Sequence, residues 1–182
     1  MYGIDLLVEE HKNIISFTEY LKMICCDILD GKAIDTEALK ECVGFGRNYA
    51  DKHHHAKEEK ILFKYMLEHL GSVAEKLIRN GMLVEHDLGR FHMGELENAI
   101  EQYEKVPTTE NKLAIITNAS GYADLLKRHI EKEDAVCYSF ALRILSDDDK
   151  SFIDEETKQF EREEDKLGIQ EKYISWLNLI LR

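Results

Sequence analysis

The sequence has a single proline and only ten glycines in 182 residues. Because these residues interrupt regular backbone, their scarcity favours a few long helices over many short strands. Basic residues are also in deficit: 24 Lys and Arg stand against 36 Asp and Glu, for a net charge of −12. Phosphate recognition needs clustered Lys and Arg, so this acidity argues against a nucleic-acid partner.

Long apolar runs are absent as well. No window approaches the ~20 apolar residues of a membrane span, and the opening MYGIDLLVEEHK lacks the basic and apolar regions of a signal peptide. The four cysteines contain no Cys-x-x-Cys pair, so we read them as reduced thiols. These absences predict a cytoplasmic protein without a membrane partner, and they leave its oligomeric state open.

Apolar residues recur at helical spacing in four long segments, with expected limits of residues 4–29, 36–70, 72–103 and 113–145. Val136, Phe140 and Ile144 fall on the predicted inward stripe of the last segment. Asn80-Gly81 is expected to interrupt the third segment.

Capping signals mark the ends of these segments. Asp35 or Thr36 can cap the second helix, and Ser146 can cap a helix after the fourth. Gly71 is expected to end the second helix, and Ser72 with Glu75 forms a capping box for the third.

Four long helices with short loops predict an all-α fold, an up-down-up-down four-helix bundle. We assign residues 1–145 to this bundle. Residues 146–182 are expected to form a C-terminal extension of one or two amphipathic helices packed on the bundle, giving a single domain overall.

The most informative feature is one histidine on the inward stripe of each long helix, two of them followed by a glutamate four residues later. Residues four apart share a helix face, so each His/Glu pair can reach one point in space. A buried carboxylate is costly unless it is paired or bound to a metal. The predicted metal ligands are His11, His54, Glu58, His86, His129 and Glu133.

This ligand set favours iron. Six ligands are too many for one tetrahedral zinc and too rich in nitrogen for magnesium or calcium. Two histidines for each metal and two bridging carboxylates would hold two iron ions and leave positions open for O2, NO, peroxide or water.

Two helices leave the register open. His55 with Glu59 offers the same spacing as His54 with Glu58, which we prefer because His54 aligns with Ile61 and Tyr65. His53 and Glu59 are then expected to be solvated, and His69 and His92 to be exposed. Asp134 competes with Glu133, but an acid at i+5 would need a local bulge to face His129.

Four segments carry a family resemblance: VEEH ending at His11, HHHAKEEKILF at 53–63, EHDLGR at 85–90 and HIEKED at 129–134. In order and spacing the chain resembles the hemerythrin-like, or HHE cation-binding, family, and FEREEDKLGIQEKY is similar to the tail of one bacterial branch. The resemblance implies a four-helix bundle with an oxo- or hydroxo-bridged di-iron centre. It matches the six predicted ligands by position, with Glu58 and Glu133 as the bridging carboxylates.

The chain departs from the oxygen-carrying members at Arg90, where they have a second histidine on the third helix. One iron would lose a histidine, which favours redox chemistry, NO binding or sensing over simple O2 carriage. Arg90 could instead pair with a carboxylate.

Three functions are therefore compared. The first is a non-haem di-iron protein that binds or reacts with O2, NO or peroxide. The second is an HD-type metal-dependent phosphohydrolase using His86 and Asp87, although Asp87 turns ~100° away from His86 on a helix. The third is a metal-free helical scaffold that binds a partner. Whether the protein is an enzyme stays open.

Overall fold

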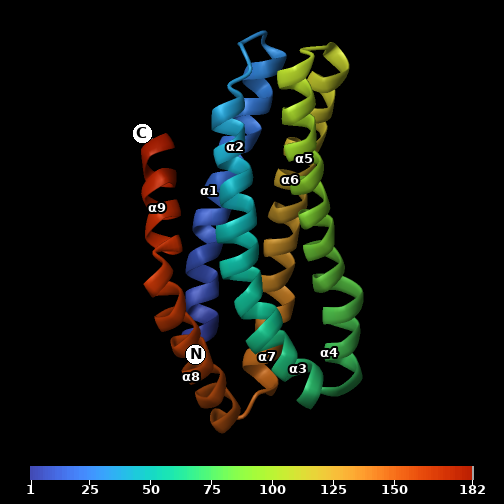
Figure 1. The fold of residues 1–182 in the computed structure, drawn as a ribbon. Coiled ribbons are helices and arrows are strands. Elements are labelled where there is room, and N and C mark those ends of the chain that lie inside the picture. Colours follow the sequence, from blue (N-terminus) through green and yellow to red (C-terminus); the bar gives the residue numbers. More distant parts are fainter. Residues whose placement is uncertain (182) are drawn as a thin grey trace.

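Four antiparallel helical rods form the body of the protein, and a C-terminal helical segment lies along one side (Figure 1). The computed structural model describes residues 1–181, apart from the side chain of Leu167. The chain runs up the first rod, down the second, up the third and down the fourth (Figure 1), so the predicted all-α, up-down-up-down bundle with extra C-terminal helices is confirmed.

The rods are built from α-helices joined end to end by wider π-helical turns, labelled η. The first rod is α1, Tyr2–Leu29, and the second comprises α2 Thr36–Phe45, η1 Gly46–His55, η2 Glu58–Leu62 and α3 Phe63–His69. The third comprises α4 Gly71–Leu77, η3 Ile78–Met82 and α5 Leu83–Lys105, and the fourth α6 Thr109–Lys132, η4 Glu133–Tyr138 and α7 Ser139–Ile144. The extension comprises α8 Asp147–Glu164, the 3-10 turn η5 Asp165–Leu167 and α9 Ile169–Ile180.

Two predicted caps are present. The Asp35 side chain accepts a hydrogen bond from the Ala38 N–H at 3.0 Å. Ser146 and Asp149 form a reciprocal capping box at the start of α8. Each cap satisfies backbone N–H groups that have no partner within their own helix.

The predicted capping box of Ser72 and Glu75 is wrong. Helix α4 begins one residue earlier, at Gly71, and its N-cap residue Leu70 makes no side-chain cap. Gly71 has a φ of +69°, a conformation that suits glycine, and it reverses the chain between α3 and α4. Helix α6 also starts earlier than expected, at Thr109 rather than at residue 113.

The π-helical turns shift the inward stripes. From Val136 onward the buried residues of the fourth rod are Cys137, Tyr138, Ala141 and Leu145, whereas the predicted Val136 and Ile144 are exposed. A π-helical turn holds an extra residue, so every later side chain rotates to a new face. The same turn, as η3, carries the third rod through Asn80-Gly81, where an interruption was expected.

Two apolar clusters fill the bundle, one on each side of the histidines. One cluster includes Phe17, Phe45 and Leu96, and the other includes Phe63 and Met66. Along α1, residues of one cluster precede His11 and residues of the other follow it. The histidines therefore form a polar layer between two buried apolar regions of the bundle.

The C-terminal extension is fastened to the first and second rods. The Asp154 carboxylate of α8 accepts hydrogen bonds from the N–H groups of Tyr2 and Gly3 at 3.0 and 2.8 Å. Trp176 of α9 donates from its indole nitrogen to Glu41 at 2.7 Å. Over the residues described, none of the helices is both long enough and apolar enough to cross a membrane.

Candidate metal centre

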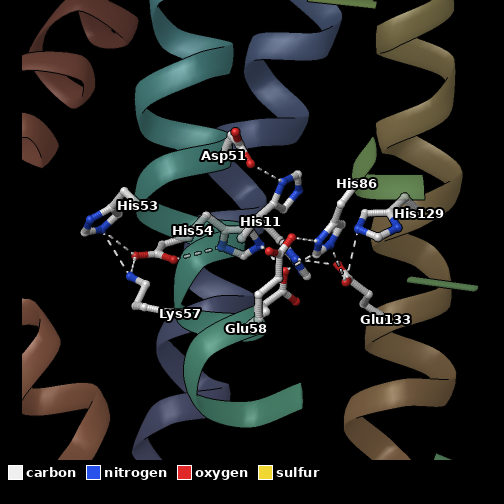
Figure 2. Close-up of polar contacts among 12 residues, drawn as sticks. His11, Asp51, His53, His54, Lys57, Glu58, His86, His129 and Glu133 are labelled. Carbon is white, nitrogen blue, oxygen red and sulfur yellow. Dashed lines mark hydrogen bonds and ion pairs between the residues drawn. The ribbon is translucent and has the colours of Figure 1, made fainter. Parts of the chain in front are cut away.

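Seven side chains from all four rods converge between the two apolar clusters, as Figure 2 shows for most of them. We call them the His–Glu cluster: His11 on α1, His54 and His55 on η1, Glu58 on η2, His86 on α5, His129 on α6 and Glu133 on η4. Each is at most 3 % exposed. The structure thus brings together all six predicted ligands and adds His55.

The cluster divides into two groups that share a carboxylate. His11, His54, Glu58 and Glu133 form one group, and His55, Glu58, His86 and His129 form the other; within each, the potential ligand atoms lie within 4.8 Å of one another. Glu133 also reaches both groups, because its two oxygens lie 3.3 Å from His11 Nε2 and 3.1 Å from His129 Nε2. Two adjacent cations bridged by two carboxylates would fit this arrangement.

A carboxylate stands behind the imidazoles of the cluster. The Nδ1 atoms of His11, His54, His86 and His129 lie 2.9, 2.9, 2.7 and 3.0 Å from Asp134, Glu10, Glu59 and Glu85, respectively. His55 Nδ1 lies 3.4 Å from Asp51. An ionised carboxylate only accepts hydrogen bonds, so the Nδ1 atoms of His11, His54, His86 and His129 carry a proton. In a neutral imidazole held this way, the Nε2 lone pair is free to bind a metal.

The inner face of the cluster has polar atoms without hydrogen-bond partners. Glu58 Oε2, both carboxylate oxygens of Glu133, His86 Nε2 and His129 Nε2 are buried, and none makes a hydrogen bond of acceptable geometry within the described residues. Such groups are costly to bury unpartnered, and a bound cation would satisfy all of them. The donor set therefore fits a metal.

In the metal-free chain, protons on the histidines balance part of the charge of the buried carboxylates. Burial disfavours the imidazolium of His11, but the hydrogen bond to Asp134 and the nearby carboxylate of Glu133 raise its pKa to about 10. Burial likewise opposes the charged form of His86, yet Glu133 and Glu58 raise the pKa of His86 well above its usual value. Against burial, His129 and His11 hold the pKa of Glu133 well below its usual range.

The structure distinguishes the inner acids from their competitors. Glu58 and Glu133 face the cluster, whereas Glu59 and Asp134 bond to the outer nitrogens of His86 and His11. An inward-facing Asp134 was expected to need a local bulge. A bulge is present as η4, but there it is Glu133, not Asp134, that is buried in the His–Glu cluster.

The second rod differs from the expectation. His54 and His55 both lie in the cluster, and the His55 ring stacks on His86 with ring centroids 3.8 Å apart. Ile61 and Tyr65, which supported the choice of His54 alone, are only half-buried because the stripe shifts to Leu62 and Met66. His55 lies in the group of His86 and His129, where it offers a third imidazole in addition to the two expected there.

Arg90 is an outer residue that pairs with carboxylates. It donates to Asp51 at 2.9 Å, to Glu59 at 2.6 Å and to Asp87 at 3.0 Å. Two of these acids stand behind His55 and His86. Arg90 therefore positions the carboxylates behind His55 and His86, although it stands where a histidine was expected in the oxygen-carrying members.

The remaining expectations have mixed outcomes. His53 is fully buried rather than solvated, and Glu59 is half-buried. His69 is exposed as predicted, whereas His92 is half-buried and bonds to Asn118. The Asp87 side chain is 77 % exposed and points to Arg90, so it is not placed as the ligand that a phosphohydrolase would need.

Sequence reasoning missed three groups that contact the cluster. Glu10 and Glu85 support His54 and His129 across the bundle, and Tyr138 lies against His11 with near-parallel rings. The repeated dipeptides Glu10-His11 and Glu85-His86 were a signal for the two acids. The position of Tyr138 had no such signal.

A pocket of about 340 Å³ adjoins the cluster on the side of η1 and α5. His55 and Arg90 line it together with Gly89, Met93 and Tyr122. His55 thus has one side toward the His–Glu cluster and another toward a space that small molecules can occupy.

A third group with metal-like spacing, Glu10, His53 and Glu161, lies beside the cluster. The ammonium group of Lys57 lies within it and bonds to both acids (Figure 2 shows Lys57 with His53). The place of a cation is therefore already taken by a lysine.

The comparisons with known proteins agree with this geometry. Residues 2–141 match the sequence model of a family described as the hemerythrin HHE cation binding domain. Among curated proteins, none matches the chain. The match covers well over half of the chain and includes every residue of the His–Glu cluster, so this metal-binding protein belongs to the hemerythrin HHE cation-binding family.

Proposed function

We propose that the His–Glu cluster holds two iron ions and that the protein binds or reacts with O2, NO or peroxide there. The observation that carries the proposal is the pairing of an inner face of unpartnered Nε2 and carboxylate atoms with an outer shell of acids behind the imidazoles. Iron bound there would supply redox chemistry and coordination of small ligands.

The two ions would divide the protein ligands unequally. His11 and His54 would hold one ion, and His55, His86 and His129 the other, with Glu58 and Glu133 reaching both. The donors are nitrogen and oxygen without sulfur, which suits iron better than a structural zinc site.

The pocket beside His55 is the proposed access route for the small ligand. The cluster is otherwise buried, and the pocket brings solvent-accessible space to a side chain of the cluster. Its walls combine Tyr122 and Met93 with the charged side chains of Arg47, Asp51, Lys52 and Arg90, and its volume admits molecules as small as O2, NO or hydrogen peroxide.

The test is the metal content and colour of protein from iron-replete cells. We expect about two irons per chain, near-ultraviolet charge-transfer absorption, and a spectral change on adding azide or NO. Glu58→Ala should abolish iron loading, while His69→Ala, at an exposed histidine, should leave it unchanged.

The competing functions give different results in the same measurement. A metal-free scaffold would contain no iron and would fold equally well after Glu58→Ala. A phosphohydrolase of the His-Asp type would lose its metal after Asp87→Ala, which the di-iron proposal expects to retain iron.

A further inference from the structure

Lys57 is a fully buried cation whose partners come from three parts of the chain. Its side chain is 1 % exposed, and its ammonium donates to Glu10 of α1, to Glu161 of α8 at 2.7 Å, and lies 3.1 Å from His53 Nε2. Burying a lysine is costly unless acids compensate its charge, so its position is set by these two carboxylates.

The first of these acids leads to the His–Glu cluster. The Glu10 oxygen that does not contact Lys57 accepts the Nδ1–H of His54 at 2.9 Å (Figure 2). Carboxylates in this position orient a metal-binding histidine and raise its basicity. Lys57 therefore acts on the support of His54.

The second acid belongs to the C-terminal extension. Glu161 lies on α8, beyond residue 141, where the family match ends. The same helix is fastened to the start of α1 through Asp154, which accepts from the Gly3 N–H at 2.8 Å. The extension thus anchors the helix that carries Glu10 and His11, and it adds one charge to their surroundings.

We infer that this extension is a working part of the metal centre: Glu161, through Lys57 and Glu10, sets the charge behind His54. Glu161 and Lys57 are positioning residues, and the inference rests on the proposed di-iron function. The acidic group at Glu10, His53 and Glu161 serves to bind the lysine rather than a third metal ion.

The sign of the effect follows from the charges. Without the negative charge of Glu161, the positive charge of Lys57 would act on Glu10 alone and make it a weaker hydrogen-bond acceptor. His54 would then donate less electron density to the iron. The oxidised, more positive iron would be less stabilised, so the midpoint potential would rise. Without the positive charge of Lys57, Glu10 would be a stronger acceptor and the potential would fall.

The experiment compares the midpoint potential and absorption spectrum of the full-length iron-loaded protein with those of Glu161→Gln and Lys57→Met. We expect opposite shifts, upward for Glu161→Gln and downward for Lys57→Met. The matched control is Glu163→Gln, an exposed acid on the same helix, which should leave the potential unchanged.

Shifts of the same sign in both variants, or a shift no larger than in the control, would overturn the inference. If Lys57→Met does not fold, the direction and size of the Glu161→Gln shift relative to the control decide. Wild-type protein without iron would instead refute the proposed function, so the two failures are distinguishable.

Discussion

The phenol of Tyr138 donates a hydrogen bond to Glu58 Oε1 at 2.5 Å while its oxygen lies 3.5 Å from His11 Nε2. Burial, followed by the charge of Glu58, raises the pKa of Tyr138 well above its usual value, so the phenol stays a donor. Tyr138 is thus a neutral hydrogen-bond donor in direct contact with a carboxylate that both groups of the cluster share.

Replacing Tyr138 with Phe should leave a buried acceptor on Glu58. We expect the iron-free protein to lose about 1–3 kcal/mol of unfolding free energy, and the iron-loaded protein to keep its iron with an altered charge-transfer spectrum. Chemical denaturation and absorption spectroscopy measure the two effects. Tyr103→Phe, at a half-buried tyrosine packed against the apolar cluster that includes Phe17, is the control. Equal behaviour of the two variants would contradict the assigned role.

Filling the pocket at Gly89 should slow ligand access without removing a metal ligand. A Cβ at Gly89 would lie 3.7 Å from the ring of Tyr122, an ordinary contact, and both residues line the pocket. We expect Gly89→Met to retain two irons and to bind NO or azide several-fold more slowly in stopped-flow experiments. Gly94→Met on the same helix, where a Cβ meets nothing within 4 Å, is the matched control. Unchanged rates in Gly89→Met would exclude this access route.

The inner and outer acids should respond differently to loss of charge. Glu133→Gln removes a carboxylate that reaches both groups, and we expect it to prevent loading of two irons. Asp134→Asn weakens only the support of His11, and comparable outer changes cost about 10- to 100-fold in metal affinity. Iron stoichiometry and competition with a chelator separate these outcomes. The reverse order would mean that Asp134 is the bridging acid.

The iron-free protein should lose stability as the pH rises. The pKa of His11 is raised to about 10 in the folded chain from an ordinary value of 6.5, so its contribution is complete below about pH 6.5 and is lost as the pH approaches 10. His86 and His129 have raised pKa values and act in the same direction.

Thermal unfolding between pH 6.5 and 10 measures this loss. In the iron-loaded protein the same imidazoles are neutral ligands, so we expect the decline to be much smaller and loading to release protons. A pH-independent stability of the iron-free protein over this range would show that these histidines are not protonated by their acidic neighbours.

The fold and most of the cluster were predictable because they depend on spacing within single helices. The periodicity of apolar residues fixed the four rods, and the intervals His54 to Glu58 and His129 to Glu133 placed each pair on one face. The prediction of which residues face inward was wrong after η1 and within and after η4. A π-helical turn rotates all later residues about the helix axis, and it has no clear signature in the local sequence.

By itself the amino-acid sequence determined that the chain is helical, that each long helix brings a histidine inward, and that two glutamates accompany them. Only the tertiary structure decided that His55 joins the cluster, that Asp134 and Glu59 support histidines from outside, and that Glu161 reaches Lys57. The reason is physical: these contacts join helices far apart in the chain, and the relative rotation and height of packed helices come from their side-chain packing, not from any interval within one helix.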